Sequence, residues 1–399
     1  MRIAIFSDTF FPQINGVSNF AFFCAKSLAE RGHQVKVFTV ISKNDISSSD
    51  FHSYDFEVCP IPSLPAPIYR RQGLRMSFPF GFTLRQLKKF KPDIIHAHTP
   101  FAAGWEAVIG SKILKIALVG EHHTFYDHYL KHVGLEYAWA KRLSWKITAG
   151  YYNRCDLIVS PSKSLADSLL ESGLKRPIKV IPNSIDTEIF SPISEKEKIK
   201  HKHNYHMSDF SAVYMGRISY EKSIDKVILA FKKVLEKDYL KTAKLILIGD
   251  GPEKNKLEQL IKKLGIDKNI IWTGILRGEA LARAVACNDV FVTASRSENM
   301  PLSVLEAMAC GLPVIAVSEN GMKEIVKDAY NGFLCQADNV AEIAQKIENI
   351  FKNKSQREIF SKNSRELAMG YSKDKIMESF ENCYEEVIKN FTPLNKSLQ

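Results

Sequence analysis

Short apolar runs that alternate with amphipathic stretches constrain the fold of this chain more than any other feature. Residues 2–7 have the pattern of a buried strand, residues 17–31 that of a helix, and residues 34–40 that of a second strand. This order predicts strand–helix–strand units of a parallel sheet. Further strands are expected at 92–98, 117–123, 156–162, 178–184, 211–217, 244–251, 269–274, 289–295 and 313–318.

The alternation is interrupted once, by a polar, lysine-rich stretch at residues 191–207 that predicts a boundary or a surface helix. We therefore expect two doubly wound α/β domains, residues 1–188 and 189–372. Residues 373–399 are expected to form a terminal helix and tail that pack back on the first domain. Open parallel sheets bind ligands beyond the carboxyl ends of their strands, so the predicted site lies in the interdomain cleft.

Composition is that of an ordinary globular protein, with 399 residues, of which 45% are hydrophobic and 25% charged. No stretch reaches the roughly 18 uncharged apolar residues of a membrane span, and the N-terminus lacks a signal-peptide pattern, so we expect a cytoplasmic protein. The seven cysteines are scattered singly. This spacing predicts reduced thiols rather than a zinc site or a disulfide framework.

The formal charge of +11 is unevenly distributed. Residues 60–150 carry thirteen Lys and Arg against five Asp and Glu. Such a basic surface attracts nucleic acid, anionic lipid or anionic small molecules, and charge does not choose among them. Residues 126–153 mix aromatic side chains with cations, as a membrane interface does, but a helix pair with buried aromatics and solvated cations would show the same mixture.

A loop rich in positive charge follows the strand expected at residues 211–217. It contains Gly216, Arg217 and Lys222, and it leads into a helix for which Ser223 is a natural N-cap. Two cations beside a helix N-terminus suit a diphosphate, although basic loop residues are also common on plain surfaces. The Walker pattern and the full Gly-x-Gly-x-x-Gly fingerprint are absent, which argues against a P-loop enzyme and a dinucleotide dehydrogenase.

Two glutamates flank the start of another short helix. Pro301 stands at its expected first position and Gly311 just past its end, so Glu298 falls in the entry loop and Glu306 about two turns deeper. Carboxylates at the mouth of a helix often bind polyol hydroxyls. Taken alone, both glutamates could equally be solvated surface acids.

Together these motifs resemble family 4 of the retaining glycosyltransferases, which have the GT-B fold. The resemblance rests on Gly216-Arg217 with Glu221-Lys222, on the run 249–252, and on Glu298 and Glu306 with seven residues between them. The first half adds FSDTFFPQINGVS, HAHTPFAAGW and VIPNSIDTEIF. Within the family, HTPF followed by EHHTFYDHYLKH is most similar to diacylglycerol glucosyltransferases and related glycolipid enzymes.

The resemblance implies transfer of a hexose, such as glucose, from a nucleotide diphosphate sugar such as a UDP-hexose to a membrane lipid such as diacylglycerol. It implies that Arg217 and Lys222 hold the diphosphate, Glu306 the ribose hydroxyls and Glu298 the donor sugar. The implied catalytic residues are His123, Arg217, Lys222 and Glu298. The implied donor-binding residues are Gly16, Gly216, Arg217, Lys222, Gly251, Leu276, Glu298, Met300, Leu302 and Glu306, and the acceptor-side residues are His98 and Tyr126.

The chain departs from the family pattern at Pro301, where many members have glycine, and at His122, where the glycolipid relatives commonly have an aromatic residue. No carboxylate is placed as a covalent nucleophile, and the resemblance implies retention by a front-face route assisted by the leaving phosphate. There is no Asp-x-Asp motif, so we expect no essential metal or other cofactor. The expected partners are the donor, a lipid or glycan acceptor and, peripherally, the anionic inner face of the membrane, without nucleic acid.

Two alternatives stay open. Within the enzyme class, the alternative is a family 4 transferase that acts on a soluble or polyprenol-linked saccharide. The alternative from a different class is a non-catalytic protein. One that binds a nucleotide sugar would have no role for the histidine on the acceptor half. One that binds a nucleic acid would have no role for the phosphate loop and the glutamate pair.

Overall fold

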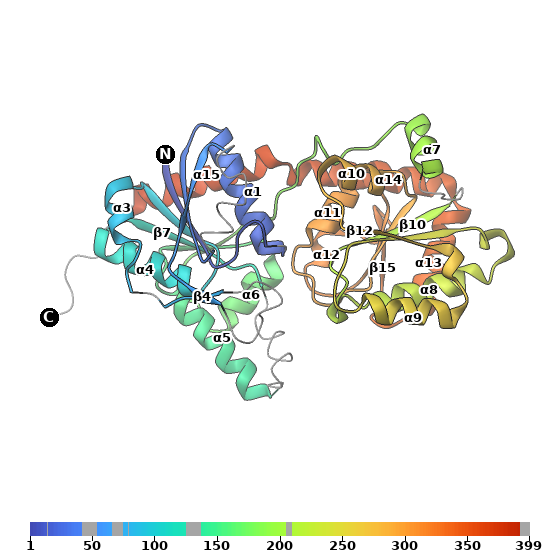
Figure 1. The fold of residues 1–399 in the computed structure, drawn as a ribbon, viewed down its shortest axis with the longest axis horizontal. Helices are drawn as coiled ribbons and strands as arrows, with labels where there is room; N and C mark the ends of the chain where they lie inside the picture. Colours follow the sequence, from blue (N-terminus) through green and yellow to red (C-terminus); the bar gives the residue numbers. More distant parts are fainter. Residues whose placement is uncertain are drawn as a thin grey trace. The chain divides into compact units, whose positions relative to one another are not determined.

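The computed structural model describes residues 1–13, 15–41, 54–65, 75–78, 80–124, 137–204 and 210–391. The chain forms two compact units: unit 1 comprises Met1–Asn183 with Asp374–Gln399, and unit 2 comprises Ser184–Lys373. Each unit is built on its own parallel sheet with helices on both faces (Figure 1). The expected α/β class with two Rossmann-like sheets is confirmed.

Unit 1 contains a seven-stranded parallel sheet in the order β3-β2-β1-β6-β7-β8-β9. The direction of the strand order reverses at β1, so β1 and β6 lie at a topological switch point, where Ile3 pairs with both Val35 and Ile94. The strands are β1 (Arg2–Ser7), β2 (Gln34–Thr39), β3 (Phe56–Pro60), β6 (Ile94–Ala97), β7 (Ala117–Glu121), β8 (Leu157–Ser160) and β9 (Ile178–Val180).

The C-terminal helix belongs to unit 1. Ile376, Phe380 and Tyr384 pack into the same buried cluster as Ile3 and Ile5 of β1. A small hairpin, β4 (Leu64–Pro65) with β5 (Arg75–Met76), lies apart from the main sheet. The helices of unit 1 are α1 (Gly16–Glu30), α3 (Leu84–Phe90), α4 (Ala102–Leu114), α5 (Ala138–Tyr152), α6 (Lys163–Glu171) and α15 (Lys373–Asn390).

Unit 2 contains a six-stranded parallel sheet in the order β12-β11-β10-β13-β14-β15. Its switch point lies between β10 and β13, where Val213 pairs with Phe291. The strands are β10 (Ser211–Met215), β11 (Lys244–Ile248), β12 (Ile270–Gly274), β13 (Val290–Val292), β14 (Val314–Val317) and β15 (Gly332–Cys335).

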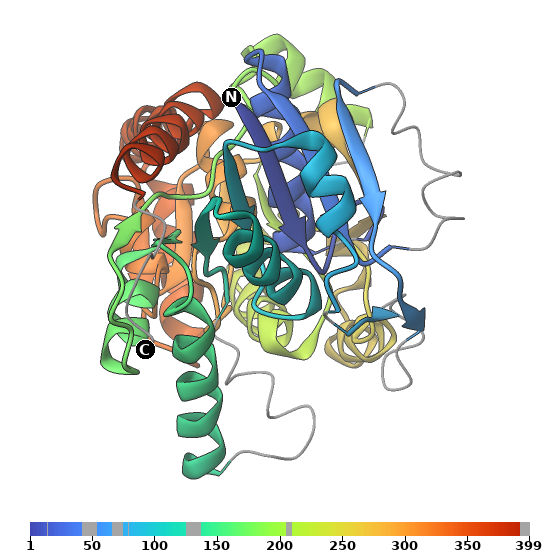
Figure 2. The same ribbon diagram turned by 90° about the vertical axis from the view of Figure 1, so that its left-hand side faces the viewer.

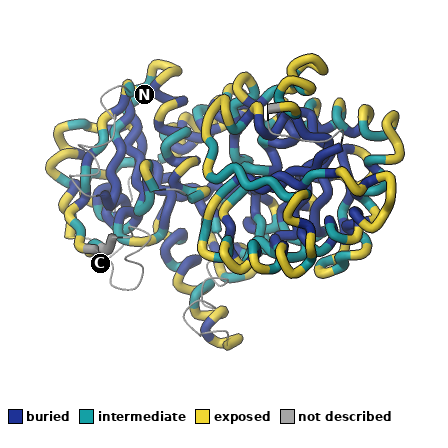
Figure 3. The backbone as a smooth tube through the Cα atoms, turned by 45° about the vertical axis from the view of Figure 1, so that its right-hand side comes forward, coloured by how far each residue is buried: buried dark blue, intermediate teal, exposed yellow. Residues whose placement is uncertain are grey.

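The helices of unit 2 pack their apolar faces on this sheet, and the strands they cover are largely buried (Figure 3). The expected polar stretch near residue 200 contains a surface helix, α7. The helices are α7 (Glu195–Asn204), α8 (Ile224–Leu235), α9 (Lys254–Leu264), α10 (Gly278–Ala286), α11 (Leu302–Ala309), α12 (Met322–Ile325), α13 (Val340–Lys352) and α14 (Lys354–Ala368). None of the described helices has both the length and the hydropathy that crossing a bilayer requires.

Candidate active site

Two glycine-containing loops pack backbone against backbone beyond β10 and β11. The amide of Ile218 donates to the carbonyl of Asp250 at 3.0 Å. A Cβ on Gly249 would lie 2.0 Å from the Gly216 oxygen, and one on Gly251 would lie 2.3 Å from the Ile218 oxygen. Glycine is therefore required at both positions for the loops to meet. This is a role for Gly251 within the fold, and its donor-binding role stays a prediction.

Lys222 and Glu298 meet across the switch point of unit 2. Lys222 ends the 3-10 turn Tyr220–Lys222 after β10, and Glu298 lies in the loop between β13 and α11. The Lys222 Nζ lies 2.6 Å from the Glu298 Oε1, and the two side chains retain 23% and 15% of their exposure. Arg217, also after β10, is exposed. The carboxyl ends of β10 and β13 thus present two cations and a carboxylate where open sheets bind ligands.

Ser223 is the N-cap residue of the helix after this loop, as predicted, but it does not cap the helix through its side chain. The Ser223 amide donates to the Tyr220 carbonyl at 3.1 Å and closes the 3-10 turn. Ser223 consequently adopts a left-handed conformation with φ of 51°, and its side chain makes no capping hydrogen bond to α8. The first turn of α8 therefore receives no cap from this hydroxyl.

Glu221, next to Lys222, is held as a carboxylate. Burial would raise its pKa, but the Ser219 hydroxyl, which donates to Oε1 at 2.6 Å, and the nearby Lys222 and Arg217 hold the pKa below its usual value. The Ser295 hydroxyl lies 3.5 Å from the Glu221 carbonyl oxygen, which joins the loop after β13 to the loop after β10.

Glu306 is only partly exposed and has no hydrogen-bond partner for its carboxyl group among the described residues. It lies on α11, for which Pro301 is the N-cap residue rather than the first helical residue, and Gly311 follows the helix end with φ of 77°. Burial raises the pKa of Glu306 to about 8. Among the described residues, none donates a hydrogen bond to its carboxyl group. Such a group gains from a ligand that supplies hydroxyl donors.

The apolar residues predicted at the donor site pack together in unit 2. Met300 is buried in the cluster that lines α11, and Leu276 and Leu302 pack against that cluster while partly exposed. They thereby support the loop before α11 and leave part of their surface accessible. Direct contact with a donor stays a prediction.

The switch point of unit 1 is organised around Asp8. The Thr99 hydroxyl donates to Asp8 Oδ2 at 2.5 Å and the Ala103 amide to Oδ1 at 3.0 Å, so the loops after β1 and β6 are linked. Burial raises the pKa of Asp8 to about 6. Gly16 is the first residue of α1, and a Cβ there would meet no atom within 4 Å. Among the described residues, none lies close enough to require glycine at this position, which leaves room for the predicted approach of a ligand.

A buried carboxylate joins the histidines of unit 1. Glu121, the last residue of β7, has no exposed surface, and its Oε2 lies 3.1 Å from His96 Nε2, 3.0 Å from His98 Nδ1 and 3.5 Å from His123 Nε2. His98 Nδ1 also lies 3.1 Å from His123 Nε2. Tyr384 of α15 extends the network, since its hydroxyl lies 2.8 Å from His96 Nδ1. The two predicted histidines, His98 and His123, are thus brought together.

The charges of this cluster follow from burial and contact. Burial, reinforced by His96, lowers the pKa of His98 to about 3, so its imidazole is neutral. Burial opposes the charge on Glu121, but the contacts with His123, His96 and His98 hold its pKa well below the usual value. The carboxylate is therefore ionised and fixes the orientation of the imidazoles. His122 points elsewhere and packs on the rings of Trp145 and Tyr152.

Sequence reasoning missed Glu121, His96 and Tyr384. The signal for His96 was present, because residues two apart on a strand share a face and His98 had been singled out. Glu121 ends the same strand that precedes His123. Tyr384 enters through tertiary packing of α15, which spacing along the chain does not reveal. Tyr126 lies outside the described residues.

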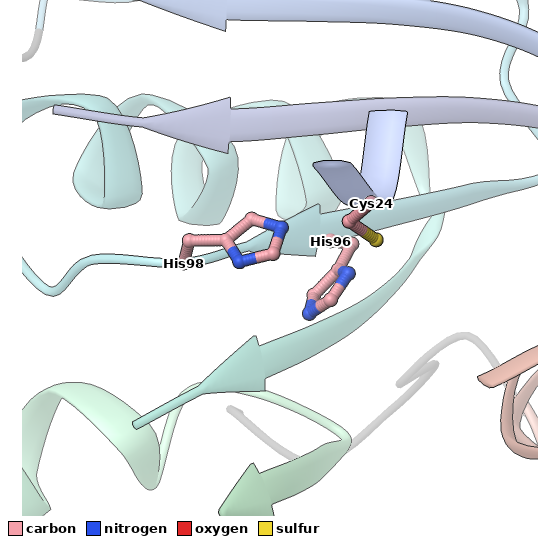
Figure 4. A group of neighbouring side chains, drawn as sticks. All are labelled: Cys24, His96 and His98. Carbon is pink, nitrogen blue, oxygen red and sulfur yellow. The ribbon is translucent and has the colours of Figure 1, made fainter. Parts of the chain in front are cut away.

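Two sets of side chains have metal-ligating atoms within 4.8 Å of one another: Cys24, His96 and His98, shown in Figure 4, and His98, Glu121 and His123. Imidazole, carboxylate and thiolate are ligands that zinc prefers. Burial raises the pKa of Cys24 well above its usual value, however, which keeps the thiol protonated and opposes ligation. The separations of His96 and His98 from Glu121, 3.1 and 3.0 Å, are also within hydrogen-bonding distance, although among the described residues neither Glu121 oxygen has a partner with hydrogen-bond geometry. The expectation of no essential metal stays a prediction.

Two Rossmann-like parallel-sheet units with the strand order described have the architecture of the GT-B fold. The comparison with family models is more specific. Residues 14–189 match the model of Glycosyltransferase Family 4, and residues 195–367 match that of the Glycosyl transferases group 1. The chain belongs to glycosyltransferase family 4, as its motifs had indicated.

Two of the relatives are named alpha-monoglucosyldiacylglycerol synthases, and others, at 25–27% identity, are named GDP-mannose-dependent alpha-mannosyltransferases. An alpha-monoglucosyldiacylglycerol synthase of Acholeplasma laidlawii is 30% identical over 99% of this chain and 100% of its own length. The Streptococcus pneumoniae protein of the same name is 30% identical over 84% of this chain and 75% of its own. Among solved structures, Anabaena Alr3699/HepE in complex with UDP superimposes with a TM-score of 0.79 at 20% identity, over 97% of this chain and 100% of that one.

Proposed function

We propose that this enzyme transfers glucose from UDP-glucose to a membrane lipid such as diacylglycerol, with retention of the anomeric configuration. The observation that carries the glycosyl transfer is the juxtaposition of Lys222 and Glu298 beside Arg217 at the switch point of unit 2. Cations there suit the charge that develops on a departing diphosphate, and a neighbouring carboxylate suits sugar hydroxyls.

The donor side of the proposal rests on unit 2. We assign Arg217 and Lys222 to the diphosphate, Glu306 to the ribose hydroxyls and Glu298 to the hexose. The Glu306 carboxyl group lacks a described donor, which supports its assignment to a hydroxyl-rich ligand. The choice of UDP-glucose draws support from the complex of HepE with UDP and from the names of the two glucolipid synthases.

The acceptor side rests on unit 1. We assign His123 to the reacting sugar and His98 to the acceptor side, with Glu121 orienting both rings. The donor breaks its bond to the diphosphate while the acceptor hydroxyl attacks the same face, and the leaving phosphate takes up the acceptor proton. This route needs no covalent nucleophile on the enzyme. The lipid acceptor draws support from the names of the relatives, each covered over at least two thirds of its length.

The location follows from these substrates. We propose that the enzyme works in the cytoplasm, in peripheral contact with the inner face of the membrane, where a lipid acceptor is accessible. The seven cysteines, all free and buried, suit a reducing compartment.

The test is transfer from labelled UDP-glucose to diacylglycerol in vesicles that contain phosphatidylglycerol, with product identity by mass spectrometry and anomeric configuration by NMR. An α-glucosyl lipid is expected. High activity toward a soluble saccharide, indifferent to vesicles, would overturn the lipid acceptor. Binding of UDP-glucose without transfer or hydrolysis in any acceptor screen would overturn catalysis.

A further inference from the structure

Helix α5 of unit 1 exposes an apolar stripe along its outer face. Trp139, Leu143 and Ile147 are 61%, 49% and 64% exposed, and they recur every fourth residue. Side chains four positions apart lie above one another on a helix, so the three form one continuous ridge. Tyr137, 61% exposed, stacks on Trp139 with ring centroids 6.4 Å apart and extends the ridge. Exposed apolar patches of this kind mark interaction surfaces.

Cations flank this ridge. Arg142 and Lys146 are exposed, and at about 100° per residue they project beside Trp139 and Leu143 on one edge of the ridge. Lys141 adds a third positive charge, and the helix Ala138–Tyr152 contains no acidic residue. The ridge is therefore complementary to an apolar surface that also carries negative charge.

The two ends of α5 differ in burial. Thr148, Ala149, Tyr151 and Tyr152 near its C-terminus are buried in the core of unit 1, which anchors the helix. The preceding turns extend away from the sheet of unit 1, as Figure 2 shows. The sequence allows two interpretations of this segment, a membrane interface or a helix with buried aromatics. The aromatic side chains at the C-terminal end of α5 are buried in the core, whereas those at its N-terminal end are exposed together with the cations.

We propose that α5 docks unit 1 on an anionic lipid bilayer, with Trp139, Leu143 and Ile147 in the boundary between head groups and acyl chains and Arg142 and Lys146 at the lipid phosphates. Amphipathic helices with aromatic and aliphatic residues on one face and cations beside them bind membranes in this way. Charge complementarity selects the bilayer over a second copy of this chain, because two copies would oppose like charges across the ridge. The inference locates the membrane contact of the proposed function, but docking itself requires no catalysis.

The test is flotation with vesicles of phosphatidylcholine alone or with phosphatidylglycerol. The wild type should float with the anionic vesicles, and the variant Trp139→Ser/Leu143→Ser/Ile147→Ser should lose about tenfold or more of its partition coefficient. The matched control is Ile199→Ser/Ile359→Ser, which removes two similarly exposed apolar side chains from α7 and α14 of unit 2. It should float like the wild type.

A charge-removing pair separates the electrostatic contribution. Arg142→Gln/Lys146→Gln should lower binding to anionic vesicles by about tenfold or more, since each cation near the surface contributes roughly fivefold. Lys262→Gln/Lys263→Gln, on α9, removes the same charge elsewhere and should have little effect. Brominated acyl chains should quench Trp139 fluorescence, so quenching should fall in Trp139→Phe and persist in Trp272→Phe.

Several outcomes would overturn the proposal. One is equal flotation of the triple variant and the wild type, and another is loss of binding only when Phe78, Phe80 and Phe82, a second exposed apolar set in unit 1, are replaced by serine. A concentration-dependent dimer that the triple variant disperses would identify a second copy as the occupant. Glucosyl transfer to a detergent-dispersed acceptor separates the docking hypothesis from the proposed function. The triple variant should retain this transfer. If the wild type floats with vesicles but shows no transfer, the proposed function fails and the docking proposal stands.

Discussion

Replacing Glu306 with glutamine is expected to remove a pH dependence from donor binding. Burial raises the pKa of the Glu306 carboxyl group to about 8, so near neutral pH most of the unliganded protein carries it protonated. A carboxylate accepts hydrogen bonds from two neighbouring hydroxyls, whereas a protonated carboxyl group must use one oxygen as a donor. Binding of the ribose hydroxyls should therefore favour the ionised form and release a proton.

The pKa fixes the size of the effect. If only the ionised carboxylate binds, affinity falls tenfold for each pH unit below the pKa, and the Kd at about pH 6 is roughly a hundredfold weaker than at about pH 9. Glutamine cannot titrate, so Glu306→Gln should give a nearly constant Kd. Its affinity should lie about tenfold or more below that of the wild type at about pH 9, where charge-assisted hydrogen bonds are lost, and should equal or exceed the wild-type affinity at about pH 6.

The assay is calorimetric titration with UDP-glucose in buffers of different ionisation enthalpy, which reports affinity and proton release together. UDP-glucose is suitable because its diphosphate diester keeps the same charge across this pH range. Glu298→Gln is the matched control, because it changes the other glutamate of the pair and should retain the slope. A wild-type Kd that does not vary with pH, or a slope that survives in Glu306→Gln, would refute the assignment of Glu306 to the ribose.

The same pKa makes a second, ligand-free readout available. The folded-state pKa of about 8 exceeds the ordinary value of 4.5, so the folded protein binds more protons than the unfolded chain between these values. Stability should fall as pH rises through that window, by an amount on the order of a few kcal/mol. Unliganded Glu306→Gln should be spared this loss and become relatively more stable at alkaline pH in urea titrations.

Four other variants test the site and its support. Lys222→Ala should lower kcat about a hundredfold or more in steady-state assays, because it removes a cation from the proposed leaving group and leaves Glu298 without its ion-pair partner. An unchanged rate in a folded variant would contradict the assignment of Lys222 to the diphosphate. Glu298→Gln should reduce transfer more than UDP binding, and equal losses in both would return Glu298 to a structural role. Burial would raise the pKa of Asp289, but Lys198 and Lys202, 2.8 and 2.7 Å away, hold this pKa below its usual value. Asp289→Asn should therefore lower the free energy of unfolding in urea by about 3 kcal/mol near neutral pH, and by progressively less below about pH 4. The buried carboxylate of Glu106 accepts hydrogen bonds from the amides of Gly81, Phe82 and Thr83 and from the Thr83 hydroxyl. Glu106→Gln should therefore destabilise unit 1 by about 2–4 kcal/mol in chemical denaturation. Glu236 is exposed, so the control variant Glu236→Gln should leave the stability unchanged.

The sequence predicted the sheets well because their strands are buried on both faces and appear as continuous apolar runs. Arg2–Ser7 was predicted to the residue, whereas the strand expected at 289–295 ends at Val292. Thr293–Ser295 remain buried beyond the strand, so the apolar pattern continues past the last ladder hydrogen bonds. The edge strands β3 and β15 were missed, since FEVCP ends in proline and GFLC is only four residues long.

Local sequence patterns placed the candidate residues in the loops where the structure has them, and their roles stay predictions, whereas these patterns did not reveal a backbone conformation or a contact with a distant helix. The loop cations and glutamates were found from their positions after strands, and the structure brings Lys222 and Glu298 together. The side-chain cap expected of Ser223 depended on a φ angle that no composition rule supplies, because the residue is committed to closing the preceding 3-10 turn. The hydrogen bond of Tyr384 to His96 joins residues 288 positions apart in the chain.

The two switch points hold their charges in physically different ways, and the difference suits different tasks. Lys222 and Glu298 pair at 2.6 Å while still partly exposed, so a ligand or water can replace either partner without leaving a buried charge behind. Glu121 is fully buried, and removing an imidazole from it would take away one of the contacts that stabilise its charge in the interior. In the proposed function, the pair in unit 2 exchanges its partners when a donor binds. The cluster in unit 1 is fitted to keep His98 and His123 in one geometry throughout.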